Sequence, residues 1–174
     1  GSRDNVRDYL EAKSIAENIG YPIIIKSTNG GGGRGIKVVL KEKELKNNFL
    51  LAKKEAELSF GSNQVYIEKY LSNPRHIEIQ ILCDNQGNAI HLGERECSIQ
   101  RRNQKIIEEC PSPVISDSER KKICDTTIKA MKKIGYFNIG TVEYLYNNGN
   151  FFFMEMNTRL QVEHTVTEEV YDID

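Results

Sequence analysis

A hairpin signal near the C-terminal end of the sequence constrains the fold most strongly. A strand-like run, Thr141–Tyr146, is followed by the turn-forming residues 147–150 and then by an aromatic run that begins at Phe151. The two runs should pair as antiparallel strands. We predict a three-residue loop between them, with Gly149 in the left-handed conformation.

The loop length matters because it decides whether Glu143 and Glu155 lie on one face of the sheet. An odd loop places them together, whereas a two- or four-residue loop separates them. From Glu155 onward, polar residues recur at every second position and would project to one side of an extended backbone: Glu155, Asn157, Arg159, Gln161 and Glu163. Carboxylates and an amide from adjacent strands would form an oxygen-ligand site for Mg²⁺ or Mn²⁺. The alternative is the solvated face of an ordinary hairpin.

Composition indicates a soluble protein with one good core or two small ones in 174 residues. The net charge of -1 argues against a dedicated nucleic-acid or membrane-surface binder, and the apolar runs are too short for a membrane span. The four cysteines lack zinc-ligand spacing, which favours buried free thiols in a reduced compartment: Cys83, Cys97, Cys110 and Cys124. Gly1-Ser2 resembles a cloning remnant, so we expect a piece of a longer polypeptide.

A glycine run, Gly30–Gly33 followed by Gly35, separates two strand-like segments. Its spacing includes G-x-G-x-x-G, but a dinucleotide-binding loop leads into a helix rather than a β-branched strand. A Walker-type phosphate loop needs Lys where Ile36 stands. We predict a glycine hairpin whose bare amides approach an anion, with a plain glycine linker as the alternative.

Helical periodicity appears at 10–19, 45–56 and 116–134. Ser116 and Glu119 should form a capping box for the last of these helices. Five of its residues should face inward: Ile123, Thr127, Ala130, Met131 and Ile134.

Strands are expected at 23–26, 36–40, 65–70, 76–82 and 89–92, and the charge-dense segment 94–109 is typical of a solvated loop. In 76–82, isoleucines alternate with polar residues, so one face should be core and the other polar. The order of elements predicts an α+β fold in two parts, a small glycine-loop lid subdomain (1–70) and an antiparallel sheet with packed helices (71–174).

Several stretches together resemble one family, the ATP-grasp module of biotin carboxylase, found in acetyl-CoA, propionyl-CoA and pyruvate carboxylases. They read IIIKSTNGGGGRGIKVV, YIEKYLSNPRHIEIQI, ERECSIQRRNQK, GTVEYL and FMEMNTRLQVEHTVTEE. They cover nearly the whole chain in the family's order. The resemblance implies an ATP-grasp fold that holds ATP between the lid and the sheet.

The resemblance implies a nucleotide site. Lys26 matches the lid lysine that contacts the phosphates, and Gly32 and Gly33 match flap glycines. The hinge that reads the adenine edge comprises Glu68, Lys69, Tyr70 and Leu71, and further nucleotide-side positions are His76, Gln100 and Asn103. Asn103 stands where the family usually has His, so it can hydrogen-bond a ribose but cannot titrate.

The resemblance also implies the sites of the chemistry. Glu143, Glu155 and Asn157 match the ligands of Mg²⁺ or Mn²⁺. The bicarbonate site matches Lys105, Arg159 and the backbone of Val162, with Gln161 in support and Glu163 as the base. The implied catalytic residues are Glu163, Arg159 and Lys105, and the implied reaction joins bicarbonate and ATP into carboxyphosphate, whose CO₂ is attacked by N1 of biotin.

The implied partners are ATP, bicarbonate, a biotin carrier domain, a carboxyltransferase component and further copies of the parent in a homo-oligomer. The final carboxyl acceptor stays open. The family also uses an N-terminal lysine and a C-terminal arginine that this sequence lacks, so we expect the chain alone to turn over poorly or not at all. The alternatives are another ATP-grasp ligase, such as a carbamoyl-phosphate synthetase, or a non-catalytic nucleotide-binding regulatory module. A bacterial parent would be cytoplasmic, and an organelle-targeted one would lie in the mitochondrial or plastid matrix.

Overall fold

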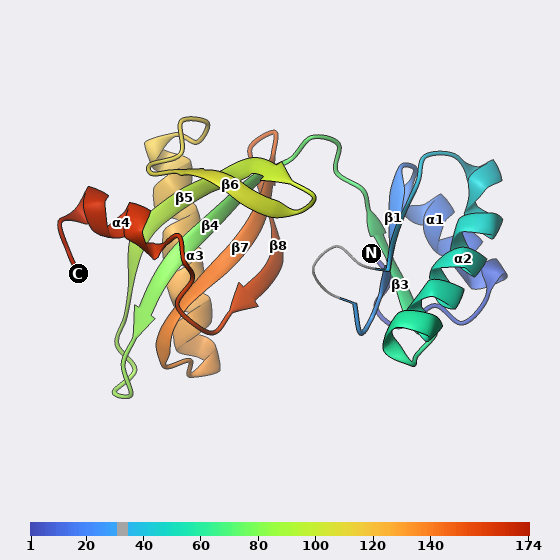
Figure 1. Cartoon of the computed structure of the whole chain (residues 1–174), viewed down its shortest axis with the longest axis horizontal. Helices are drawn as coiled ribbons and strands as arrows, with labels where there is room; N and C mark the ends of the chain where they lie inside the picture. Colours follow the sequence, from blue (N-terminus) through green and yellow to red (C-terminus); the bar gives the residue numbers. More distant parts are fainter. Residues whose placement is uncertain (31–34) are drawn as a thin grey trace. The chain divides into compact units, whose positions relative to one another are not determined.

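The computed structural model describes residues 1–30 and 35–174, so the predicted flap glycines Gly32 and Gly33 lie outside the described residues. The chain forms two compact units, Gly1–Ser72 and Asn73–Asp174 (Figure 1). The sequence predicts a division after residue 70. None of the helices formed by the described residues combines the length and apolar character needed to cross a membrane.

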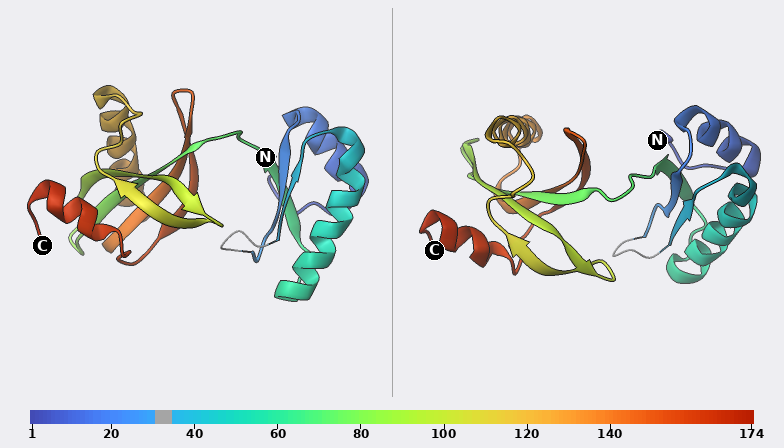
Figure 2. Two further views of the ribbon diagram at one scale, coloured as in Figure 1. Left: turned by 45° about the horizontal axis from the view of Figure 1, so that its top comes forward. Right: turned by 90° about the horizontal axis from the view of Figure 1, so that it is seen from above.

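The first unit is a three-stranded antiparallel sheet with two helices. Its elements are α1 (Tyr9–Ile19), β1 (Ile23–Ser27), β2 (Ile36–Val39), α2 (Glu42–Phe60) and β3 (Val65–Lys69), with strand order β2-β1-β3. Both helices cover the same face of the sheet (Figure 2), where Phe49 packs in one cluster with Ile23 and Ile25. Because side chains alternate along a strand, Lys26 projects from the other face.

The second unit is a five-stranded antiparallel sheet with α3 on one face. Its elements are β4 (Arg75–Cys83), β5 (Ala89–Arg101), β6 (Gln104–Glu109), α3 (Asp117–Ile134), β7 (Asn138–Asn147), β8 (Asn150–Asn157) and α4 (His164–Tyr171). The strand order is β6-β5-β4-β7-β8, which makes β4 the central strand. Ile77, Ile79 and Ile81 of β4 are buried in one cluster with residues of α3.

The predicted capping box of α3 is present at Ser116 and Glu119. Its buried stripe consists of Ile123, Cys124, Thr127 and Met131. Two residues predicted to face inward, Ala130 and Ile134, are instead exposed. The stripe ends at Met131, so the last turn of the helix carries no core residue.

The charge-dense segment that was predicted as a loop is a pair of strands. β5 continues to Arg101, and β6 begins at Gln104. The prediction failed because several of these charges are compensated inside the unit. Arg95 pairs with Glu78 at 2.7 Å, and Arg120 of α3 reaches a β5 carboxylate at the same distance. Charge indicates solvent exposure only when it is unpaired.

The C-terminal hairpin has a two-residue loop rather than the predicted three-residue loop. Asn147 pairs with Asn150, and the loop residues Asn148 and Gly149 have φ values of 48° and 78°. Positive φ at both positions characterises a type I′ turn, whose twist matches that of the flanking strands. Tyr144 pairs with Phe153 whereas Glu143 pairs with Glu155, so residue 154 is the extra residue of a β-bulge. Because of this extra residue, Glu143 and Glu155 lie on the same face of the sheet, as predicted, although the loop has two residues and not three.

The cysteines follow the prediction for the most part. Cys83, Cys97 and Cys124 are buried free thiols, and Cys110 is half-buried. Burial raises the pKa of the Cys124 thiol to about 12, which keeps it protonated at neutral pH.

Candidate active site

The polar face of β4 is as deeply buried as its apolar face. Glu78 is 0% exposed, Gln80 is 2% exposed and His76 is 9% exposed. Alternation along the sequence predicted a polar face but not its burial. A central strand has neighbours on both sides, and here residues from β5, β6, β7 and α4 close over this face. Polar groups in such a place must satisfy one another.

The Glu143 carboxylate lies at the centre of this polar face. It accepts hydrogen bonds from His76 Nε2 at 2.7 Å, Asn157 Nδ2 at 2.7 Å and Gln161 Nε2 at 3.1 Å, and Lys105 Nζ lies at 3.4 Å. Three of these four donors converge on Oε1, and His76 is the one described donor to Oε2, so Oε2 keeps an acceptor site for a further ligand. The Oε1 atom of Gln161 is buried and has no partner among the described residues.

These donors hold Glu143 in its charged form. Burial alone would raise its pKa, but the hydrogen bond from His76 and the charge of Lys105 outweigh that penalty. The pKa of Glu143 falls to about 2. The group is therefore a permanent anion at physiological pH, as a ligand of a hard cation must be.

Lys105 joins three carboxylates. Its ammonium bonds Glu78, lies 2.5 Å from Glu163 Oε1 and 3.4 Å from Glu143 Oε1. Burial lowers the pKa of Lys105. The negative charge of Glu78 and the bond to Glu163 raise this pKa by a larger amount, so the net shift is upward. Burial also opposes ionisation of Glu163, and the Lys105 contact reverses this, so the pKa of Glu163 is lowered. The lysine and the predicted base thus form one ion pair.

Arg95 was not predicted as a site residue, although it contacts this cluster. Its guanidinium is completely buried and donates through Nε to Glu78 Oε1 at 2.7 Å. Nη1 donates to Gln80 Oε1 and Thr167 Oγ1, both at 2.8 Å. Glu78 was missed as well. The available signal was the His76-x-Glu78-x-Gln80 alternation in a strand whose neighbours on both sides also carry polar residues.

The predicted nucleotide-side residues His76 and Gln100 contact each other. Gln100 Nε2 donates to His76 Nδ1 at 2.7 Å, and His76 Nε2 in turn donates to Glu143. The structure therefore links these two residues to the acidic centre. Asn103 lies at the exposed tip of the β5–β6 hairpin with φ 62°. Asn adopts positive φ more readily than most residues, which gives a local reason for its presence there.

Not all residues of the predicted bicarbonate site converge. β8 ends at Asn157, and the chain then turns into α4, so the extended backbone expected through Glu163 is wrong. Gln161 and Glu163 reach the cluster. Arg159 is exposed and donates to the Leu160 carbonyl at 3.2 Å, and Val162 is 89% exposed.

The first unit carries the predicted lid residues. Lys26 Nζ lies 2.6 Å from Glu68 Oε2 and 5.9 Å from the centre of the Tyr66 ring. Lys69 Nζ donates to the carbonyls of residues 20 and 21, each at 3.0 Å. Tyr70 and Leu71 follow β3 directly. Lys26 is thus held beside the hinge segment by an ion pair.

The carboxylates fit a divalent cation in their chemistry and placement. Glu143 and Glu155 are opposite each other in the β7–β8 ladder, where paired side chains share a face. Glu155 is exposed, and no described residue bonds its carboxylate. Asn157 directs its Nδ2 at Glu143, so its oxygen is available only after the amide rotates. A cation at Glu143 could bind Oε2, where His76 is the one described donor.

A second grouping of possible ligands fits a cation less well. Ligand atoms of His76, Glu78 and Glu143 lie within 4.8 Å of one another. The Lys105 ammonium, however, already bonds both carboxylates of this group. It supplies the positive charge that a metal ion would bring, so these three residues form a salt-bridge network.

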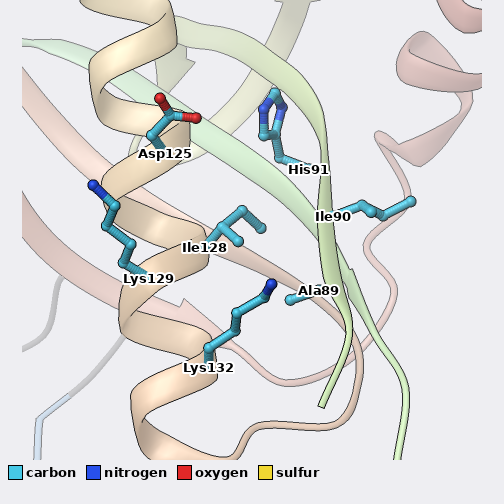
Figure 3. A pocket seen from close by; sticks show the side chains of 7 residues that line it. All are labelled: Ala89, Ile90, His91, Asp125, Ile128, Lys129 and Lys132. Atoms are coloured by element: carbon cyan, nitrogen blue, oxygen red, sulfur yellow. The ribbon is translucent and has the colours of Figure 1, made fainter. Parts of the chain in front are cut away.

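A separate pocket of about 580 Å³ lies between α3 and the start of β5 (Figure 3). Its lining consists of Ala89, Ile90, His91, Asp125, Ile128, Lys129 and Lys132. None of the predicted site residues lines it. The cluster centred on Glu143 therefore remains the candidate site, because its groups are paired, buried and shifted in pKa.

Comparison with known proteins gives one family over the full length. Residues 1–174 match the model of the carbamoyl-phosphate synthase L chain, ATP binding domain. Biotin carboxylase 1 of Bacillus subtilis is 53% identical over 176 residues, which cover 100% of this chain and 39% of that protein. Pyruvate carboxylase of Staphylococcus aureus is 51% identical over 174 residues, covering 100% of this chain and 15% of that protein.

Solved structures agree with this match. A biotin carboxylase complex with β-γ-ATP from Campylobacter jejuni has a TM-score of 0.93 at 50% identity, covering 100% of this chain and 39% of that one. The biotin carboxylase domain dimer of Hydrogenobacter thermophilus 2-oxoglutarate carboxylase, in complex with MgADP, ADP and bicarbonate, has a TM-score of 0.92 at 49% identity, with the same coverage. The chain thus spans well under half the length of these relatives, and the predicted ATP-grasp fold is confirmed.

Proposed function

Since the chain belongs to the family of carbamoyl-phosphate synthase L chain ATP-binding domains, we propose that it is the central part of a biotin carboxylase. The reaction is the ATP-dependent carboxylation of biotin by bicarbonate. The observation that carries this proposal is the Lys105–Glu163 ion pair beside Glu143 in the second unit. In this pair, the Lys105 ammonium can bind an anionic substrate, and the Glu163 carboxylate beside it can act as a base.

The first role of these residues is to hold bicarbonate. The Lys105 ammonium remains charged because its pKa is raised, and it provides the point charge that attracts the anion. Arg159 is exposed, and among the described residues its one hydrogen bond is to the Leu160 carbonyl, so its guanidinium can turn and bind two oxygens of a planar anion. The backbone of Val162 and the orphaned Oε1 of Gln161 complete the polar wall.

The second role is proton removal. Glu163 is ionised and touches Lys105, so a bicarbonate bound at Lys105 lies within reach of its carboxylate. Loss of the bicarbonate proton to Glu163 yields an oxygen nucleophile that attacks the γ-phosphorus of ATP and releases ADP. Carboxyphosphate then separates into CO₂ and phosphate, and N1 of biotin attacks the CO₂ as its proton passes to the released phosphate.

The family resemblance assigns nucleotide and metal roles to residues of each unit. In the first unit, Lys26 contacts the phosphates and Glu68 to Leu71 read the adenine edge, while the flap role of Gly32 and Gly33 stays a prediction outside the described residues. In the second unit, His76, Gln100 and Asn103 lie on the nucleotide side, while Glu143, Glu155 and Asn157 would hold Mg²⁺ or Mn²⁺. The ion, when bound, offsets the charge of the transferred phosphoryl group. The MgADP and bicarbonate named for the Hydrogenobacter thermophilus relative support this assignment.

The wider setting is part of the same proposal. Biotin arrives on a carrier domain, a carboxyltransferase component uses the carboxybiotin, and the parent forms a homo-oligomer, in keeping with the dimer named for one relative. A bacterial parent would work in the cytoplasm, and an organelle-targeted one in the mitochondrial or plastid matrix. Because the chain spans 39% of a complete relative, we expect little or no turnover from it alone.

The test measures ADP release and carboxybiotin formation by the full-length protein that contains this chain, with and without bicarbonate and free biotin. Bicarbonate-dependent ADP release with carboxybiotin supports the proposal. Carbamoyl phosphate as the product would identify the rival ligase, and metal-dependent ATP binding without phosphate release would identify a regulatory module. Robust bicarbonate-dependent ATP hydrolysis by the 174-residue chain alone would refute the expected dependence on flanking regions.

A further inference from the structure

We propose that Arg95 is a positioning residue that sets the geometry of the Lys105–Glu163 pair from both sides, an inference that rests on the proposed function. Arg95 belongs to β5 and touches neither member of the pair. It acts on Lys105 through Glu78 and on Glu163 through Thr167 of α4.

The first connection passes through the two oxygens of Glu78. Arg95 Nε donates to Oε1 at 2.7 Å, and the Lys105 ammonium bonds Oε2 of the same carboxylate. Both Glu78 and Arg95 are 0% exposed, so water does not compete for either contact. The planar guanidinium of Arg95 fixes the orientation of the Glu78 carboxylate, and the carboxylate in turn fixes the position of the Lys105 ammonium.

The second connection passes along α4. Glu163 is the N-cap residue of this helix, and Thr167 and Tyr171 follow at intervals of four residues, which places all three along one side. Thr167 Oγ1 accepts from Arg95 Nη1 at 2.8 Å and is 2% exposed. Tyr171 packs against Gly93 of the same strand, where an added Cβ would lie 2.1 Å from the tyrosine Oη.

These contacts place α4 on β5 at two points, residues 93 and 95, and leave Glu163 at the free end next to Lys105. The buried guanidinium of Arg95 thus connects β4 and α4, which are distant in sequence. Catalysis depends on how well a base and an anion-binding group are pre-positioned, and displacements of about 1 Å can cost about 100-fold in rate. Arg95 supplies this pre-positioning.

Removing Arg95 itself would leave the buried Glu78 with Lys105 alone as its cation and Gln80 and Thr167 without their donor, so lost activity could reflect unfolding of the unit. The informative variants therefore change Thr167. T167V removes the hydroxyl at nearly constant volume and leaves Arg95 its bonds to Glu78 and Gln80. T167S is the matched control, because it keeps the hydroxyl and removes only a methyl group.

The experiment uses the full-length protein and measures bicarbonate-dependent ATP hydrolysis, the KM values for ATP and bicarbonate, and the melting temperature. We expect T167V to lower kcat/KM for bicarbonate by about tenfold or more. Its KM for ATP should change by less than about twofold, and T167S should stay near wild type. Assays well below the melting temperature of each variant separate this effect from unfolding.

A T167V protein with wild-type kinetics for bicarbonate, or one whose KM for ATP rises equally, would overturn the positioning role. A merely structural hydrogen bond would lower the melting temperature without changing the ratio between the two substrates. If the wild-type protein shows no bicarbonate-dependent ATP hydrolysis, the proposed function fails, and the positioning role falls with it. The wild-type assay therefore distinguishes the two failures.

Discussion

Glu143 and Glu155 are directly opposite each other in the β7–β8 ladder, yet their environments differ completely. Glu143 is 3% exposed and contacts four donors, whereas Glu155 is exposed and bonded by none of the described residues. One carboxylate is part of the folded interior, and the other is available to a ligand. Their proposed metal can therefore be probed through Glu155 without disturbing the core.

We expect E155Q to raise the Mg²⁺ concentration needed for half-maximal activity of the full-length protein by about tenfold or more. The free energy of unfolding should change by less than about 0.5 kcal/mol, because the side chain is exposed. E169Q, at an exposed position of α4, is the matched control and should leave both quantities unchanged. Equal Mg²⁺ dependence in E155Q and wild type would exclude Glu155 as a ligand.

Acid should destabilise the second unit through Glu143. Its pKa is lowered from 4.5 to about 2, so the folded state favours the ionised form. The resulting stabilisation is fully present above pH 4.5 and is lost as the pH falls toward 2, with a size of about 3 kcal/mol. Urea unfolding of wild type between pH 7 and pH 3 should show this loss.

The matching variant is E143Q, which cannot titrate. It will be less stable than wild type at neutral pH, so the comparison concerns the pH dependence and not the absolute stability. We expect its free energy of unfolding to fall less steeply between pH 5 and pH 3. Parallel curves for the two proteins would show that other groups govern the acid response.

Lys105 should matter for stability as well as for chemistry. K105M leaves three carboxylates close together without their shared cation, which should cost about 3 to 5 kcal/mol of unfolding free energy. The pKa of Glu163 should rise, because its lowering depends on the Lys105 contact. Carboxyl NMR titration measures the pKa.

K121M removes a lysine that is 78% exposed and paired with Asp125 on the surface of α3, so it should be nearly neutral. A K105M protein as stable as K121M would mean that the carboxylates separate or protonate at little cost.

Gly93 offers a test of how α4 is held on β5. Its φ is +69° and an added Cβ would meet Tyr171, whereas Gly87 has φ +87° with nothing within 4 Å. G87A should cost about 1 kcal/mol from backbone strain alone, and G93A should cost about 1 to 3 kcal/mol more. Chemical denaturation of the two variants measures the difference.

The excess cost should disappear when the obstructing side chain is absent. In a Y171A background, G93A should therefore cost about as much as G87A does in wild type. An undiminished cost would show that Tyr171 swings aside freely and does not hold the helix.

Most of the elements followed from local patterns, but β6 and α4 were not predicted. The capping box at Ser116 and Glu119 and the apolar stripe that includes Ile123 are encoded within a few residues, so they could be predicted from the sequence. The family resemblance rested on motifs that are likewise local. The carboxylates Glu143 and Glu155 were predicted to share a face, although the predicted loop was wrong.

Only the tertiary structure decided which charges are buried. Arg95 and Glu78 lie in segments that read as a loop and as an ordinary strand, and their pairing requires β4, β5 and α4 to meet. The bulge at residue 154 was not predicted either, because it is visible only in how the residues of β8 pair with those of β7. Local patterns state what each segment prefers, but the cost of burying a charge depends on partners far along the chain.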